Sequence, residues 1–209
     1  MRLFITFLFF LAARCLTPIS AQEVISMQSK TDGISVGATV GFLSFRDDIA
    51  HPRGAESGPG FGGHIQYGFN HKFSGLLAVQ NYIVTAKSEN KVDQTYPYLE
   101  VDVSAVFTFG STNSQLRPML SAGGTYTKMS ESYYDFINGT GEINDEVYSG
   151  IGFVGGAGIS YFMQQQLSIE LIFQIHSGAF SKTLVNRLPV NVQHDYYTLN
   201  GLLGLSYHF

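Results

Sequence analysis

The sequence alternates between apolar and polar or small residues, in stretches of about ten residues or more. The last stretch is the clearest. One of its faces carries Leu199, Gly201, Leu203, Leu205, Tyr207 and Phe209, and the other carries Asn200, Leu202, Gly204, Ser206 and His208. Successive side chains of a β-strand point to opposite faces, so a period of two predicts strands. No segment after Ala21 shows a sustained helical period, and we therefore expect an all-β protein.

The same pattern along the whole chain predicts eight strands, separated by gaps that alternate in length. The strands are expected at residues 34–45, 60–70, 73–86, 95–109, 115–128, 147–162, 166–176 and 195–209. The short gaps are Asn70–Lys72, Gly110–Ser114 and Met163–Gln165; the longer ones are Arg46–Pro59, Lys87–Gln94, Met129–Glu146 and Ser177–His194. Tight turns at one end and larger loops at the other are typical of outer-membrane barrels. The predicted fold is an eight-stranded antiparallel up-and-down transmembrane β-barrel.

The composition favours a sheet whose outer face meets lipid. Charged residues make up only 13% of the 209 residues, about half the share in a typical soluble domain. A soluble lipocalin-like barrel is the architectural alternative. It would need an apolar interior, whereas here the polar face of each strand has to point inward.

The N-terminus is typical of an exported protein. Arg2 is followed by the apolar run Leu3–Ala13 and by a cleavage region that ends at Ala21. We expect a signal peptide at residues 1–21, a short periplasmic tail at 22–33 and the barrel at 34–209. The apolar run is shorter than the ~20 residues of a spanning helix, the alternative interpretation.

Cleavage after Ala21 would remove the single cysteine, Cys15, and with it any disulfide. It would also remove Arg2 and Arg14, which leaves 10 of the 12 Lys and Arg residues against 16 Asp and Glu, a net charge of −6. This balance argues against a nucleic-acid partner.

Aromatic residues cluster at the ends of the expected strands. Beside the short turns lie Tyr67, Phe69, Phe73, Phe107, Phe109, Tyr161, Phe162, Tyr207 and Phe209, and beside the long loops lie Phe45, Tyr96, Tyr98, Tyr126, Tyr148, Tyr196 and Tyr197. Aromatic girdles mark both membrane–water interfaces of outer-membrane barrels. We therefore expect both groups to face outward. A general preference of aromatic residues for strands would explain their number but not their positions.

An eight-stranded barrel is only wide enough for its own inward side chains. The expected inward residues include His64, Gln66, Glu100, Asp102, Ser104, Arg117, Ser121, Thr125, Glu170 and Gln174, with space left by Gly150, Gly152, Gly156 and Gly158. These side chains are interpreted as a hydrogen-bonded plug; a polar path for a solute or proton is the alternative. The inward carboxylates are expected to pair with His64, or with Arg117 in the case of Glu170.

No set of Ser, His and acidic residues has a spacing that suits nucleophilic catalysis. His176 and Ser177 are neighbours and must point to opposite faces of a strand. His176 and His208 should lie at opposite ends of adjacent strands, which disfavours a shared metal site. We expect neither an enzyme nor a bound cofactor or metal.

Two of the expected external loops differ in charge. Met129–Glu146 contains five acidic and no basic residues, but Ile137 and Gly139 break any calcium-loop spacing, so a solvated acidic loop is expected. Ser177–His194 carries Lys182 and Arg187 among apolar residues. This second loop is expected to contact lipopolysaccharide phosphates or a partner protein.

Several short motifs, in order, resemble one known family. They are Tyr98-Leu99-Glu100-Val101, Leu116–Gly123, Gly155–Ile159, Leu167–Leu171 and Gly204–Phe209. The chain resembles the outer-membrane β-barrel domain family common in the Bacteroidota, with the architecture of the small OmpX-type barrels; Asp102 replaces the usual proline of the first motif. The resemblance implies a location in the bacterial outer membrane. It also implies that the barrel-assembly machinery reads the terminal Phe209.

The family does not imply one activity, and two functions remain open. The first is a structural or surface-interaction barrel whose external loops contact outer-membrane lipid, lipopolysaccharide or an extracellular or envelope protein. The second is a narrow channel or a transport or secretion accessory barrel.

Overall fold

The structure is a computed structural model that describes residues 29–47, 55–85, 95–135, 142–185, 188–190 and 194–209. The expected signal peptide at 1–21 and residues 22–28 of the expected tail lie outside these ranges. No helix in the described ranges is long and apolar enough to cross a membrane.

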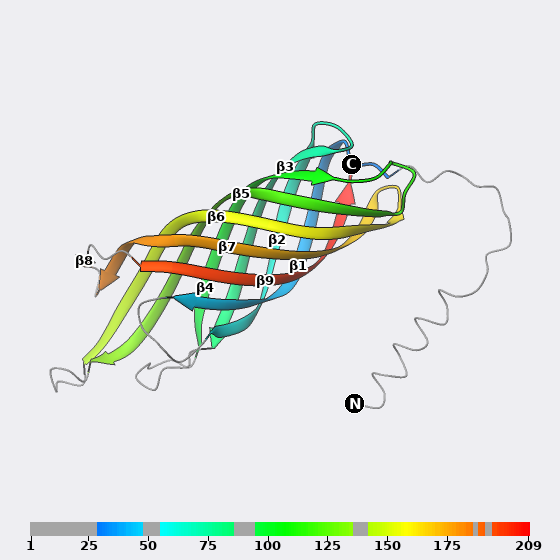
Figure 1. The fold of residues 1–209 in the computed structure, drawn as a ribbon. Helices are drawn as coiled ribbons and strands as arrows, with labels where there is room; N and C mark the ends of the chain where they lie inside the picture. Colours follow the sequence, from blue (N-terminus) through cyan, green and yellow to red (C-terminus); the bar gives the residue numbers. More distant parts are fainter. Residues whose placement is uncertain (1–28, 48–54, 86–94, 136–141, 186–187, 191–193) are drawn as a thin grey trace, which may run out of the picture.

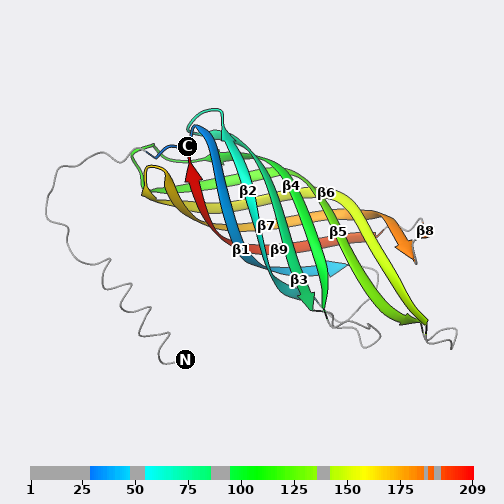
Figure 2. The same ribbon diagram turned by 180° about the vertical axis from the view of Figure 1, so that it is seen from behind.

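Eight long strands form a closed barrel (Figures 1 and 2). They are β1 (Gly33–Asp47), β2 (Glu56–Gly68), β3 (Phe73–Thr85), β4 (Thr95–Thr108), β5 (Leu116–Asp135), β6 (Glu142–Gln164), β7 (Leu167–Val185) and β9 (His194–His208). Each pairs antiparallel with the next, and β1 closes the ring on β9, from Ser35 opposite His208 to Asp47 opposite Tyr196. The short β8 (Leu188–Val190) pairs only with the end of β7. The predicted eight-stranded antiparallel barrel is confirmed.

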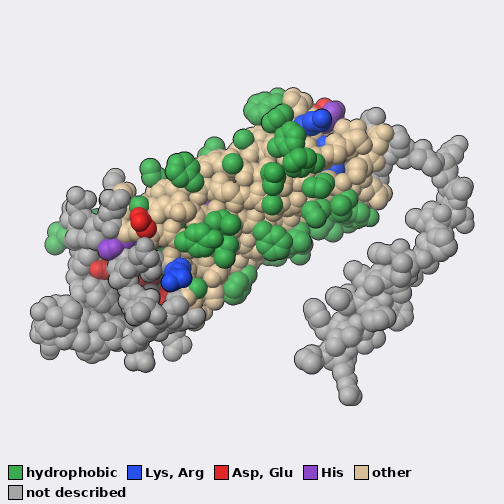
Figure 3. Space-filling view, viewed as in Figure 1, with side chains coloured by type: hydrophobic (Ala, Val, Ile, Leu, Met, Phe, Trp, Pro, Cys, Tyr) green, Lys and Arg blue, Asp and Glu red, His purple; other side chains and the backbone are tan. Residues whose placement is uncertain are grey.

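The outer face of the barrel is apolar, as the alternation predicts. Val40, Phe61 and Phe153 are 59%, 61% and 80% exposed on three different strands, although each is flanked along its strand by residues that point inward. In Figure 3 hydrophobic side chains cover the middle of the barrel, and charged side chains gather toward its two ends. An apolar exterior around a polar interior is the arrangement of a lipid-embedded barrel and the reverse of a soluble one.

Two of the predicted loops are largely strand. β5, β6 and β7 have 20, 23 and 19 residues, against 13 in β2 and 13 in β3. β5 runs on to Asp135, β6 begins at Glu142 and β7 ends at Val185, so Met129–Glu146 and Ser177–His194 are not loops throughout. Backbone pairing continues beyond the membrane, but the outward residues there no longer have to be apolar. Apolar alternation therefore marks the lipid belt rather than the full strand.

The short turns all lie at one end of the barrel, together with the start of β1 and the C-terminus (Figure 1). They join β2 to β3, β4 to β5 and β6 to β7. The long β5–β6 hairpin projects from the opposite end. This arrangement is the predicted separation of tight periplasmic turns from larger external connections.

Candidate functional site

The interior of the barrel is the candidate site, because the charged and polar residues of the strands converge there. Of the ten predicted inward residues, eight are buried: His64, Glu100, Asp102, Ser104, Arg117, Thr125, Glu170 and Gln174. Gln66 and Ser121 are half-buried. The predicted inward face of the strands is thus confirmed, and the lumen divides into a central, an outer and a periplasmic layer.

The central layer is built around His176, which lies between two carboxylates. Its Nε2 is 3.1 Å from Asp102 Oδ2, and its Nδ1 is 3.7 Å from Glu100 Oε1. Thr198 Oγ1 donates to Glu100 Oε1 at 3.1 Å and lies 3.0 Å from His176 Nδ1, and Asn200 Nδ2 donates to Glu100 Oε2 at 2.6 Å. All five residues are buried. Strands β4, β7 and β9 therefore meet in one hydrogen-bonded cluster, which we call the central cluster.

Sequence reasoning did not identify His176 as the partner of the acids, although His176 lies on the same strand face as Glu170 and Gln174. It assigned the buried carboxylates to His64 instead, which is correct for Glu170 and wrong for Glu100 and Asp102. The sequence did contain one signal for this, because residues 170, 174 and 176 are separated by even numbers of positions and so share one face of the strand. The register between strands was missing from the sequence, because only the pairing of β7 with β9 sets His176 opposite Thr198.

Several oxygen atoms beside the central cluster have no hydrogen-bond partner among the described residues. They include the hydroxyls of Tyr82, Tyr98, Tyr196, Thr125 and Thr127. An unsatisfied buried polar atom costs about 1–3 kcal/mol, so such atoms are generally bonded to protein or water. The central layer is therefore expected to hold ordered water.

The outer layer of the lumen is aromatic and apolar. Its buried members are Leu43, Phe45, Tyr82, Val84, Tyr96, Tyr98, Met129, Tyr148, Phe180, Tyr196 and Leu202, which we call the aromatic layer. Ring centroids are 4.7 Å apart for Phe180 and Tyr196, and 5.2 Å apart for Phe45 and Tyr98. This packing closes the lumen toward the outside.

The prediction that the aromatic residues beside the long loops form an outward-facing girdle is wrong for most of them. Only Tyr126 and Tyr197 of that group face outward, whereas Phe45, Tyr96, Tyr98, Tyr148 and Tyr196 are buried in the lumen. On the periplasmic side, Phe162 is also buried and packs on His208, with ring centroids 5.1 Å apart. Clustering at strand ends does not distinguish the two faces. The even spacing along the strand does distinguish them, because Tyr96 and Tyr98 lie on the same face of β4 as the inward Glu100.

Glycines make room for the aromatic layer. A Cβ atom on Gly152 or Gly178 would lie 2.7 or 2.6 Å from the Tyr196 hydroxyl, and one on Gly60 would lie 2.2 Å from the Tyr82 ring. These distances are far below van der Waals contact. The predicted role of the inward glycines of β6, which is to leave space for bulky groups opposite, is confirmed for Gly152.

The periplasmic layer contains two separate polar sites instead of the expected pair of Arg117 and Glu170. Glu170 lies 3.7 Å from His64, whose Nε2 is 3.1 Å from Ser206 Oγ. Arg117 hydrogen bonds instead to the chain before β1 and to turns at the mouth. Both residues lie near this end, but their strands direct them to different partners. A cavity of about 30 Å³ beside Glu170 and Gln174 has room for one or two water molecules.

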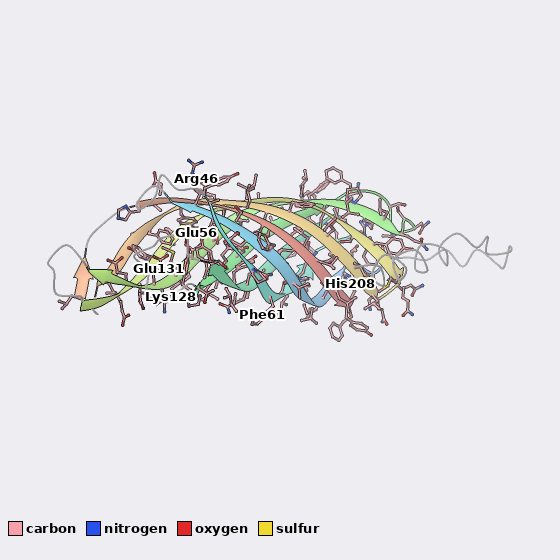
Figure 4. The ribbon with its side chains drawn as sticks, turned by 90° about the horizontal axis from the view of Figure 1, so that it is seen from below. Arg46, Glu56, Phe61, Lys128, Glu131 and His208 are labelled. Atoms are coloured by element: carbon pink, nitrogen blue, oxygen red, sulfur yellow. The ribbon has the colours of Figure 1, made fainter. Side chains whose placement is uncertain are left out.

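The chemistry of the lumen is that of a closed interior. His176 is 0% exposed, and the neighbouring Ser177 is exposed on the outer face, as predicted. Within the described part of the chain, no group of three or more His, Cys, Asp and Glu residues is placed to hold a metal ion. Figure 4 shows Glu56, Lys128 and Glu131 toward one end of the barrel and His208 toward the other, with Phe61 projecting outward.

A closed antiparallel barrel with an apolar exterior and a packed polar interior defines a membrane-spanning β-barrel protein. The chain belongs to the outer membrane protein beta-barrel domain family, whose sequence model matches residues 9–209. Its location is the bacterial outer membrane. No curated protein shows significant sequence similarity to it.

Solved barrels with the same fold come from several bacteria. Neisserial surface protein A is 14% identical with a TM-score of 0.63, over 85% of this chain and 98% of that one. OprG from Pseudomonas aeruginosa is 18% identical with a TM-score of 0.60, over 88% and 99%. Ail, the attachment invasion locus protein of Yersinia pestis, is 16% identical with a TM-score of 0.51, over 85% and 99%. At these identities the likeness concerns the fold.

Proposed function

We propose that this barrel is a surface-contact protein rather than a channel, and that the projecting ends of β5, β6 and β7 are its contact surface. The observation that carries the proposal is the length of these strands, which exceeds that of β2 and β3 by at least six residues each. A strand rises about 3.3 Å per residue and is tilted by about 40°, so the extension adds roughly 20 Å of strand and roughly 15 Å of height beyond a lipid belt. Such a rigid platform presents side chains clear of the membrane.

The β5–β6 hairpin of this platform is strongly acidic, which favours a basic partner. Its register sets Glu131 opposite Glu146 and Asp135 opposite Glu142, while Ser132 Oγ donates to Asp145 Oδ1 at 2.8 Å. Like charges directly opposite each other destabilise a strand pair. A surface rich in Lys and Arg complements the acidic character of this hairpin, and we propose a basic protein surface as the class of partner.

Three further assignments belong to the same proposal. The protein is not an enzyme, because both buried His–acid groups of the described lumen, at His176 and at His64, are closed to substrates. Lipopolysaccharide contacts the outer rim, where Arg46 and Lys128 are exposed on β1 and β5. The chain comes from the Bacteroidota branch of its family, as the motifs around Tyr98 and Gly155 suggest.

The alternative of a narrow channel is favoured by the polar centre of the lumen, which is expected to hold ordered water. The aromatic layer above it opposes this reading, because its side chains are buried and pack ring against ring. We therefore assign the polar centre to holding the barrel together.

Binding to a basic probe tests the proposal. The barrel, reconstituted in lipid nanodiscs, should bind a fluorescent oligolysine peptide through the hairpin, with an affinity that falls as salt rises. A variant with the five hairpin acids changed to their amides should bind at least about tenfold more weakly, since each lost contact with a charged group contributes about 1.5 kcal/mol or more.

Asp32→Asn, a neutralisation at the periplasmic end, is the control and should bind as the parent does. Equal binding by the parent and the hairpin variant would contradict the assignment of the acidic hairpin as the contact surface.

A further inference from the structure

The chain just before β1 crosses the periplasmic mouth and touches all three turns there. The Ser29 amide donates to Thr112 O at 2.6 Å, the Lys30 amide donates to Gln165 O at 3.0 Å, and Thr31 Oγ1 lies 3.4 Å from His71 O. The three acceptors belong to the β4–β5, β6–β7 and β2–β3 turns. These turns are spread around the ring, while β1 lies between β2 and β9. Residues 29–32 can reach all three only by spanning the opening.

Arg117 holds this segment from inside the lumen. Its side chain is fully buried, and its Nη1 donates to Thr31 Oγ1 at 2.7 Å and to Ser29 Oγ at 3.2 Å. Its Nη2 donates to His71 O at 2.5 Å. Within the described ranges no carboxylate lies within ion-pair distance of Arg117. The guanidinium therefore depends on the crossing segment and on turn carbonyls for its hydrogen bonds, and charge-assisted bonds of this kind are among the stronger ones.

The segment joins the barrel through one glycine. Gly33, the first residue of β1, has a φ of +89°, a conformation that L side chains rarely adopt. This conformation turns the chain from its path across the mouth into the direction of β1. The β1–β9 ladder begins only at Ser35. Residues 29–32 can therefore detach from the turns without breaking a strand pair of the barrel wall.

We infer that residues 29–32 form a latch that closes the periplasmic mouth, hinged at Gly33 and locked by Arg117. The aromatic layer closes the lumen at the outer end, so the latch encloses the polar centre and the cavity beside Glu170 between two barriers. The inner barrier is the one that can open, because it rests on a few side-chain and turn contacts. This assignment concerns the periplasmic end and does not depend on the proposed contact surface.

Thiol accessibility in the lumen tests the latch. Ser168 is fully buried at the periplasmic end, where its Oγ lies 2.9 Å from His208 Nε2. A Ser168→Cys reporter is placed in the full chain, with Cys15→Ser so that it is the only thiol, and is exposed in nanodiscs to a charged, membrane-impermeant thiol reagent. The parent should react slowly.

The double change Ser29→Ala and Thr31→Val removes both side-chain acceptors of Arg117 and should speed labelling about tenfold or more, since losing one hydrogen bond to a charged group shifts an equilibrium by about that factor. Thr31→Ser retains the hydroxyl and should keep the slow rate. Heat-modifiable gel mobility confirms that every variant is a folded barrel.

A second reporter separates a lifted latch from a loosened barrel. Met129→Cys lies in the aromatic layer, and its labelling rate should not respond to the latch changes. If Ser168→Cys labels at the parent rate in the latch variant, or if both reporters accelerate together, the latch assignment is wrong.

Discussion

At the scale of single residues, the central cluster concentrates more buried charge than any other group in the described lumen. Glu100 and Asp102 lie two residues apart on one face of β4, and His176 is the basic group that contacts both. Burying charges in a barrel interior is tolerable only when they are paired and hydrogen-bonded. Thr198 and Asn200 complete the hydrogen bonding of Glu100. We interpret the cluster as a structural lock between β4, β7 and β9.

Removing the imidazole should therefore be costly. His176→Leu leaves two buried carboxylates without their basic partner and is expected to lower the free energy of unfolding by about 3–5 kcal/mol. The urea dependence of the folded fraction, followed by gel mobility, measures this loss. Adding Asp102→Leu to His176→Leu should recover part of it.

His71→Leu is the matched control, because His71 and Asp32 form an exposed pair at 3.6 Å. Exposed pairs contribute about 0–1 kcal/mol. A His176→Leu barrel as stable as the His71→Leu control would contradict the lock.

Two glycines of β6 test the packing of the aromatic layer. A Cβ on Gly152 would lie 2.5 Å from Ser177 O and 2.7 Å from the Tyr196 hydroxyl, whereas a Cβ on the outward Gly155 meets nothing within 4 Å. Gly152→Ala should cost about 1–3 kcal/mol through overpacking. Gly155→Ala should change stability by no more than about 0.5 kcal/mol in the same urea titration. Equal effects of the two would mean that Tyr196 does not pack against β6 as described.

At the scale of strands, the sequence predicts the barrel well because the lipid belt imposes a strict alternation on every crossing. The strand starts and ends beside the short turns, as at Phe73, agree with the pattern within a few residues. The outer ends of β5, β6 and β7 were missed because polar residues there occupy both faces of the strand, as the neighbours Glu131 and Ser132 do on β5.

The composition of the lumen was predicted only in part. Inward polar residues such as Glu170 and Gln174 follow from parity along their own strands. The pairing of Arg117 with the segment before β1 does not follow, because it depends on how that segment crosses the mouth. Strand alternation carries no information on this long-range contact.

The acidic β5–β6 hairpin supplies a prediction at this scale. Glu131 stands opposite Glu146, and replacing one of two like charges across a strand pair should stabilise the pair by about 0.2–1 kcal/mol. Glu131→Gln should therefore slow amide hydrogen exchange in the outer half of β5 and β6. Asp195→Asn, at the same end but opposite Ala179, should leave that exchange unchanged. Faster exchange in Glu131→Gln would show that the carboxylate supports the hairpin instead.

At the scale of the whole molecule, the protein is an outer-membrane barrel whose described interior carries three layers of buried side chains. The aromatic layer lies toward the outside, the central cluster in the middle, and Arg117 with residues 29–32 at the periplasmic mouth. Eight strands enclose only enough space for side chains, and the described cavity of about 30 Å³ holds no more than one or two waters. In the proposed function, the ends of β5, β6 and β7, which reach beyond the membrane, are the parts that meet a partner.

The central claim is that this barrel acts through its surface and does not conduct. Single-channel recording of the purified protein in planar lipid bilayers tests this claim most directly. The parent barrel, shown by gel mobility to be folded, should give no stable current steps across a range of voltages and salts. Reproducible steps of one uniform conductance from the folded parent would contradict the account and identify the protein as a channel.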